Sequence, residues 1–169
     1  LDIYLGAKCS FCISTGLGFH EVPIIFRRPI ILLANPLGNA GINHETALIL
    51  CKHNVFKKDK RRLSLSEIFS HGVGYAFDTR IYKEKGVELV DNTPEEIRDV
   101  AIEMAENLEF KRQLNPKDEE LQKTFRSLLA LNIKRYSYHK EVKAYRDYRG
   151  PIRFRYSTKF LRENKNWLR

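Results

Sequence analysis

A glycine turn near the start of the chain has the residue types that bind phosphate. Ser14-Thr15-Gly16-Leu17-Gly18 follows a short β-prone run and precedes a segment that can form a helix. Backbone N–H groups, the positive end of a helix dipole and two hydroxyls can meet at such a turn. Glycines also allow positive φ angles and close approach of the backbone. The pattern predicts a phosphate-binding turn. The alternative is an ordinary turn between a strand and a helix that binds no ligand.

The elements that must position this turn alternate between strands and helices. The hydrophobic pattern and the turn residues predict strands at 9–14, 30–34, 48–51 and 86–91. They predict a short helical crossover within 19–26 and helices at 64–72, 93–108, 115–131 and 157–163. This alternation is typical of an α/β fold with a mainly parallel sheet and flanking helices. Ligands of such sheets lie at the carboxyl ends of strands, which points to the loops after Ser14 and Ala34.

Two helices have sequence patterns that define both a start and a buried face. Thr93-Pro-Glu-Glu96 supplies an N-cap, a proline at the first helical position and a glutamate at the third. Apolar residues three and four apart then predict the inward side chains. These are Ile97, Val100, Ala101, Met104 and Leu108 in one helix, and Leu121, Phe125, Leu128 and Leu129 in the next.

The run from Phe11 to Ile31, taken whole, resembles the nucleotide-binding half of GT-B glycosyltransferases and of the related nucleotide-sugar 2-epimerases. It is more closely similar to a family of bacterial glycosyltransferases found with surface-polysaccharide genes. The similarity extends to Ser64–Phe69, Gly86–Ile97 and Phe160–Leu168, whereas Ile133–Tyr148 does not share it. The resemblance implies a Rossmann-like, C-terminal half of a GT-B-type fold.

The resemblance also implies roles for individual residues. Ser14, Thr15, Gly16, Leu17 and Gly18 would hold the diphosphate of a nucleotide sugar, and Glu21, two residues before Pro23, would bind the ribose hydroxyls. Leu17 replaces the second glycine of the epimerase turn. His20 stands where the epimerases have a carboxylate, which favours sugar transfer over epimerisation.

The remaining candidate contacts each have a structural alternative. His20, Arg27 and Arg28 are candidate diphosphate contacts, since transfer from a nucleotide sugar builds negative charge on its leaving group. His20 is otherwise a surface or core-edge histidine, and the two arginines are otherwise structural or solvated. Asn35 can reach the base or sugar, or can simply cap its loop. Glu21 is otherwise an exposed helix carboxylate.

Three cysteines raise the question of a metal or redox site. Cys9-x-x-Cys12 and Cys51-x-His53 have the residue types of a zinc set, but a spacing of three along a strand sends Cys9 and Cys12 to opposite faces. No helix begins directly after them to lower a thiol pKa. We therefore expect neither a metal nor a redox site, and no cofactor besides the nucleotide-sugar substrate. So few cysteines favour a reducing, cytoplasmic location.

The net charge of +9 is confined to one end of the chain. Residues 1–131 hold 18 basic and 18 acidic side chains, whereas 132–169 hold 12 basic and 3 acidic ones, interleaved with tyrosines, phenylalanines and a tryptophan. This composition is typical of a platform for single-stranded nucleic acid. It equally suits an arm that docks on a second domain. The resemblance of Phe160–Leu168 to the glycosyltransferase family favours this second interpretation. Contact with anionic lipid at the inner face of the membrane stays open as well.

These observations together predict a two-part organisation. Residues 1–131 would form a donor-binding domain that lacks its N-terminal part, because the chain opens on Leu1 in mid-fold, and 132–169 would form a basic arm docking on the missing N-terminal domain. The expected function is transfer of a sugar from a nucleotide diphosphate to the hydroxyl of a glycan or lipid-linked acceptor. The catalytic base would come from the missing domain, so no catalytic residue is assigned. The alternative is a nucleic-acid-binding module that uses the arm.

Overall fold

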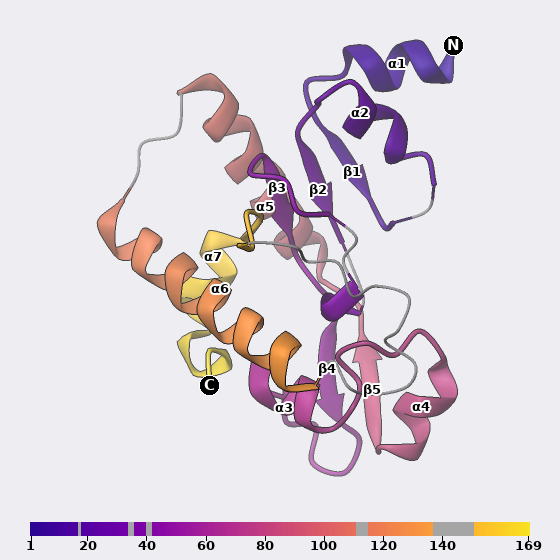
Figure 1. Ribbon diagram of the computed structural model, residues 1–169, viewed down its shortest axis with the longest axis vertical. Helices are drawn as coiled ribbons and strands as arrows, with labels where there is room; N and C mark the ends of the chain where they lie inside the picture. Colours follow the sequence, from indigo (N-terminus) through magenta and orange to yellow (C-terminus); the bar gives the residue numbers. More distant parts are fainter. Residues whose placement is uncertain (17, 34–35, 40–41, 111–114, 137–150) are drawn as a thin grey trace.

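The computed structural model describes residues 1–16, 18–33, 36–39, 42–110, 115–136 and 151–169 (Figure 1). In chain order, the elements are α1 (Asp2–Lys8), β1 (Cys12–Ser14), α2 (Glu21–Ile25), β2 (Ile30–Leu32), η1 (Leu37–Asn39), β3 (Ala47–Ile49), β4 (His53–Phe56), α3 (Leu65–Ser70), α4 (Thr79–Glu84), β5 (Val87–Val90), α5 (Pro94–Glu109), α6 (Pro116–Tyr136), β6 (Arg155–Tyr156), α7 (Thr158–Glu163) and η3 (Lys165–Trp167).

Four short strands form a fully parallel sheet in the order β1-β2-β3-β6. Cys12 pairs with Ile30, Ile30 with Ala47, and Leu48 with Arg155. The two inner strands, β2 and β3, are buried along their whole length, as expected of strands covered on both faces. A separate antiparallel pair, β4 and β5, continues from the lower end of β3 (Figure 1). The expectation of a mixed α/β fold with a mainly parallel sheet is therefore confirmed.

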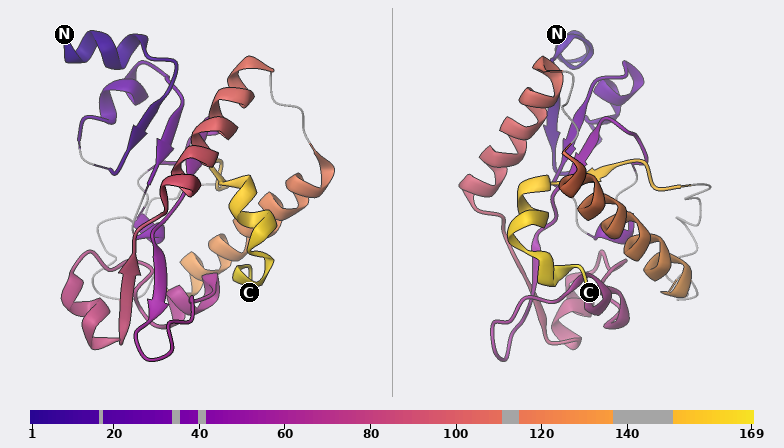
Figure 2. Two further views of the ribbon diagram at one scale, coloured as in Figure 1. Left: turned by 180° about the vertical axis from the view of Figure 1, so that it is seen from behind. Right: turned by 90° about the vertical axis from the view of Figure 1, so that its left-hand side faces the viewer.

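The long helices α5 and α6 hold the C-terminal elements against the sheet. α5 contacts β2 and α7, and α6 contacts α3, β6 and α7 (Figure 2). The start of α5 follows the sequence prediction: the Thr93 hydroxyl accepts from the Glu96 N–H, and the Glu96 carboxylate accepts from the Thr93 N–H. This reciprocal capping box satisfies two N–H groups that a helix otherwise leaves without partners.

A cluster of aromatic rings joins the C-terminal segment to the core. Trp167 stacks on Phe125 of α6 with 6.2 Å between ring centroids, and Tyr156 and Phe160 lie 4.9 and 5.2 Å from Trp167. All four side chains are buried, as is Phe154. The chain's own core therefore buries these rings of the C-terminal segment, and docking of 132–169 on a second domain stays a prediction.

Several boundaries differ from the sequence predictions. β4 was not predicted, because its first two residues, His53 and Asn54, are polar although both are buried. α4 was not predicted either, since Tyr82 is its one buried side chain in a charged segment. α6 runs past Leu131 to Tyr136, across the predicted boundary between domain and arm. Leu108 was predicted to face the core but is 43% exposed in the last turn of α5.

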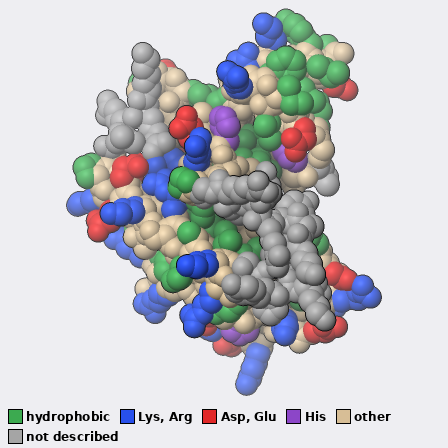
Figure 3. All heavy atoms as spheres, in the orientation of Figure 1, with side chains coloured by type: hydrophobic (Ala, Val, Ile, Leu, Met, Phe, Trp, Pro, Cys, Tyr) green, Lys and Arg blue, Asp and Glu red, His purple; other side chains and the backbone are tan. Residues whose placement is uncertain are grey.

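Exposed hydrophobic side chains gather on one end of the molecule, around α1 and α2 (Figure 3). They include Ile3, Tyr4, Leu5, Phe19 and Ile25, each at least half exposed. Among the described residues, no helix is both long and apolar enough to cross a bilayer.

Candidate functional site

The glycine turn lies where the sequence prediction expected it, at the carboxyl end of β1. The Leu33 N–H donates to the Ser14 carbonyl at 2.8 Å, which holds the end of β1 against β2. Gly16 and Gly18 have φ angles of 92° and 48°, a region that side chains with a Cβ rarely occupy. The two glycines are therefore what allows the chain to reverse between β1 and α2. Leu17 lies outside the described residues.

Some polar groups of the turn form hydrogen bonds within it, and others have no partner among the described residues. The Ser14 hydroxyl accepts from the Gly16 N–H at 3.1 Å, so this pair stabilises the turn itself. The backbone N–H groups of Gly18, Phe19 and His20 have no acceptor among the described residues. Thr15 and Gly18 are exposed. The turn thus offers N–H donors and the Thr15 hydroxyl to a ligand in solution, and an anion is the ligand that such donors fit best.

His20 and Glu21 lie side by side directly after the turn. His20 Nε2 lies 3.3 Å from Glu21 Oε1, while the Glu21 side chain remains 64% exposed. The His20 ring is buried, and its Nδ1 has no hydrogen-bond partner among the described residues. His20 is therefore a core-edge histidine that can orient the Glu21 carboxylate, and Glu21 keeps a free oxygen to accept from a hydroxyl.

The two arginines of the predicted site lie at the other end of α2. Arg28 Nε donates to the Ala7 carbonyl at 2.6 Å and so holds the end of α1. Arg27 follows α2 with a φ of 56° and is exposed. Because β1 and β2 are parallel, residues just before Ile30 lie at the amino edge of the sheet, opposite the turn. The Glu21 N–H donates to the Gly18 carbonyl at 3.0 Å, so Glu21 lies beside Gly18 of the turn, and the arginines lie apart from both. Asn35 lies outside the described residues.

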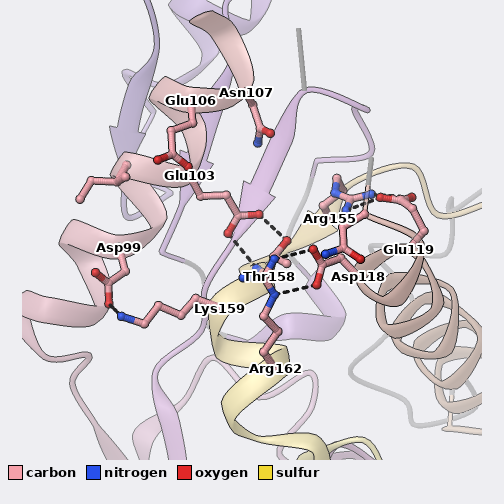
Figure 4. A pocket seen from close by; sticks show the side chains of 12 residues that line it. Asp99, Glu103, Glu106, Asn107, Asp118, Glu119, Arg155, Thr158, Lys159 and Arg162 are labelled. Atoms are coloured by element: carbon pink, nitrogen blue, oxygen red, sulfur yellow. Dashed lines mark hydrogen bonds and ion pairs between the residues drawn. The ribbon is translucent and has the colours of Figure 1, made fainter. Parts of the chain in front are cut away.

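A pocket that the sequence analysis missed lies between α5, α6 and α7 (Figure 4). This interhelical pocket has a volume of about 280 Å³. Its acidic residues come from α5 and α6 and its basic residues from β6 and α7, which are far apart in the sequence. The charged residues are Asp99, Glu103, Glu106, Asp118, Glu119, Arg155, Lys159 and Arg162.

Most charges of the interhelical pocket neutralise one another. Arg162 donates to both carboxylate oxygens of Asp118, at 2.7 and 2.5 Å, and lowers the pKa of that carboxyl group. Glu103 accepts from the N–H and the hydroxyl of Thr158. Lys159 pairs with Asp99 and lowers the pKa of its carboxyl group. We interpret the pocket as a seam of ion pairs that fixes α7 against α5 and α6.

One signal in the sequence could have located this seam. Asp99, Glu103 and Glu106 recur at a spacing of three or four, which places them on one face of a helix. The three basic residues of the pocket recur at similar spacing, at 155, 159 and 162. From the sequence alone those cations belong to an unbalanced arm, because the position of their partners depends on the tertiary structure.

The cysteines are free thiols in the structure. Cys9 and Cys12 are half-buried, and Cys51 is buried. Burial raises the pKa of the Cys51 thiol to about 12, so it stays protonated at neutral pH. Within the part of the chain that the structure describes, no group of three or more His, Cys, Asp or Glu side chains is arranged to hold a metal ion.

Comparison of the chain with models of protein families, with curated proteins and with solved structures finds no match.

Proposed function

We propose that this chain is the donor-binding part of a GT-B-like glycosyltransferase that binds a nucleotide sugar at the glycine turn. The observation that carries the proposal is the turn itself: a strand of a parallel sheet ends in two left-handed glycines, and the N–H groups of Gly18, Phe19 and His20 have no acceptor among the described residues. The resemblance of Phe11–Ile31 to the nucleotide-binding half of these enzymes supports the same assignment.

Each residue of the turn has a distinct role in the proposal. The open N–H groups and the Thr15 hydroxyl donate to oxygens of the diphosphate, which stabilises the negative charge that builds up as the glycosidic bond breaks. Glu21 accepts hydrogen bonds from the ribose hydroxyls, and its neighbour His20 orients it. Arg28 holds α1 and is left out of the site. The sugar passes to an acceptor hydroxyl with a base supplied by a partner domain.

A nucleic-acid platform on 132–169 has weaker support as a function. Stacking requires an exposed aromatic face, and Phe154, Tyr156, Phe160 and Trp167 are all at most 7% exposed. Tyr138, Tyr145 and Tyr148 lie outside the described residues.

Calorimetric titration with UDP, GDP, ADP and CMP tests the proposal. We expect at least one nucleoside diphosphate to bind, and the Glu21→Gln variant to bind it about tenfold more weakly, because a hydrogen bond to a charged acceptor is lost. Thr15→Val should weaken binding by a smaller factor. Glu84→Gln, which changes an exposed carboxylate on α4, is the matched control and should bind as wild type does. Absence of binding by all four nucleotides would refute the donor site.

A further inference from the structure

A second, larger groove is lined by residues of α3 and of the C-terminal segment. These two parts of the chain lie at the other end of the molecule from α1 and α2 (Figures 1 and 2). It encloses about 1080 Å³. The segment Arg61–Glu67 forms one wall and Arg162–Arg169 forms the other, and the Ser66 N–H donates to the Arg169 carbonyl at 2.9 Å where they meet. We call this feature the basic groove.

The lining of the basic groove has more positive than negative charge. Its basic residues are Arg61, Arg62, Arg162, Lys165 and Arg169, and its acidic residues are Glu67 and Glu163. Glu67 binds both terminal nitrogens of Arg61 and offsets its charge, and Glu163 lies 3.9 Å from Lys159, outside the lining. The lining keeps an excess of positive charge, because it has five basic and two acidic side chains.

Three of the cations have no carboxylate partner among the described residues. Arg162 pairs with Asp118 in the interhelical pocket, whereas the described hydrogen-bond acceptors of the Arg62 and Arg169 guanidinium groups are the amide oxygens of Asn164 and Asn166. Lys165 is exposed and has no hydrogen-bond or ion-pair partner among the described residues. Charges of one sign that line one groove without counter-ions favour an anionic ligand.

Arg62 is held in place for such a ligand. Its Nη1 donates to Asn164 Oδ1 at 2.6 Å, and its Cζ lies 5.4 Å from the centre of the Phe160 ring. These two contacts fix the guanidinium plane, while Nε and Nη2 donate to none of the described residues. Two free N–H edges of a positioned guanidinium match the geometry of phosphate oxygens.

The aromatic residues at the groove are too buried to stack on a nucleobase. Trp167 is 7% exposed and Phe160 is 5% exposed, so neither offers a face for stacking. Among the described residues, Trp167 is the one aromatic residue of the lining, whose remaining groups include four guanidinium groups and an ammonium group. This arrangement favours recognition of phosphate groups over recognition of nucleobases.

We propose that the basic groove binds a ligand carrying phosphate groups, through Arg62, Lys165 and Arg169. This site is separate from the glycine turn and goes beyond the proposed donor function. A phosphorylated small molecule and a phospholipid headgroup present the same chemistry to it.

Titration with inorganic pyrophosphate tests the proposal, with sulfate at equal ionic strength as the comparison anion. We expect pyrophosphate to bind more tightly than sulfate. Lys165→Gln should weaken pyrophosphate binding about threefold, as for loss of an exposed charge pair, and Arg62→Gln about tenfold. Lys165 is exposed, so its variant keeps the fold even where Arg62→Gln is destabilised. Lys83→Gln, which removes an exposed charge from α4, is the matched control.

A second experiment distinguishes a soluble phosphate compound from a phospholipid headgroup. Phosphatidylcholine vesicles with and without phosphatidylglycerol are sedimented with the same variants. If pyrophosphate binding is weaker in Lys165→Gln but not in Lys83→Gln, the ligand is a soluble phosphate compound. If only binding to the phosphatidylglycerol vesicles is weaker in Lys165→Gln, the ligand is a lipid headgroup. Equal effects of the two lysine variants, or no binding in either experiment, would overturn the proposal. So would tighter binding of an oligothymidine that depends on the same residues. Gly16→Ala changes the glycine turn and should leave the part of pyrophosphate binding that depends on Lys165 unchanged.

Discussion

Arg155 and Glu119 form a bidentate ion pair between β6 and α6. Arg155 Nη1 and Nη2 donate to Glu119 Oε2 and Oε1 at 3.0 and 2.8 Å, and the Arg155 side chain is 7% exposed (Figure 4). Two parallel hydrogen bonds of this kind fix the relative orientation of both side chains. A cation from the basic end of the sequence therefore acts inside the fold, as a tie between the sheet and α6.

Removing one partner of this pair should cost more stability than removing both. We expect Glu119→Gln to lower the free energy of unfolding by about 3 kcal/mol, because Arg155 is left buried without its counter-ion. The double variant Glu119→Leu with Arg155→Met should recover much of that loss. Urea unfolding followed by circular dichroism measures both. Glu88→Gln breaks the exposed pair with Lys60 and should change stability by less than about 1 kcal/mol. A double variant less stable than Glu119→Gln would contradict this account.

Trp167 should be a major contributor to the stability of the core. Because it packs against Phe125, Tyr156 and Phe160, we expect Trp167→Ala to destabilise the protein by about 3–5 kcal/mol. Phe110→Ala, at a position that is 61% exposed, should change the free energy of unfolding by less than about 0.5 kcal/mol. Thermal and urea unfolding give both values. A small effect of Trp167→Ala would show that the C-terminal segment is not part of the core.

Stability should fall in acid, in part through Glu67. Its hydrogen bonds from Arg61 hold the pKa of the carboxyl group at about 2, below the value of about 4.3 in an unfolded chain. The folded state therefore favours the ionised form, and the stabilisation is present above the unfolded pKa and is lost as pH falls toward 2. The Glu67→Gln variant can keep the contact to the Ser64 N–H. We expect it to be less stable than the wild type at pH 7 and to lose less of its unfolding free energy than the wild type between pH 5 and 3. Glu84→Gln should keep the wild-type slope in the same urea titrations.

The conformation of Gly16 should matter more for nucleotide binding than for folding. A Cβ at Gly16 would meet one atom, of Leu32 at 4.0 Å, so the cost of Gly16→Ala comes from its φ of 92°. Gly86 has a φ of 64° and open space around it, which makes Gly86→Ala the matched control. We expect both variants to lose about 1 kcal/mol of stability. Only Gly16→Ala should weaken binding of the nucleoside diphosphate, by at least about tenfold, because the turn must adopt another conformation. Equal binding by both variants would argue against the donor site.

Local features were predictable because neighbouring residues produce them. The Thr93 capping box, the Ser64 capping box and the Ser157 cap of α7 each depend on residues within one helical turn. The glycine turn is local in the same way, since its φ angles require glycine wherever the turn lies in the fold. The buried His53 of β4 could not be predicted from its neighbours. Its partner Glu96, at 2.8 Å, lies 43 residues away.

The sequence by itself determined the order of most strands and helices, their caps, the glycine turn after β1 and the concentration of positive charge after residue 131. Only the tertiary structure decided which of those charges remain free. Pairing of β3 with β6 brings Arg155 beside α6, and α7 then carries Lys159 and Arg162 to Asp99 and Asp118. Lys165 and Arg169 lie beyond this seam and face the basic groove. Charge is a property of composition, but neutralisation depends on distance, and distances between remote segments are set by the packing of the sheet and helices.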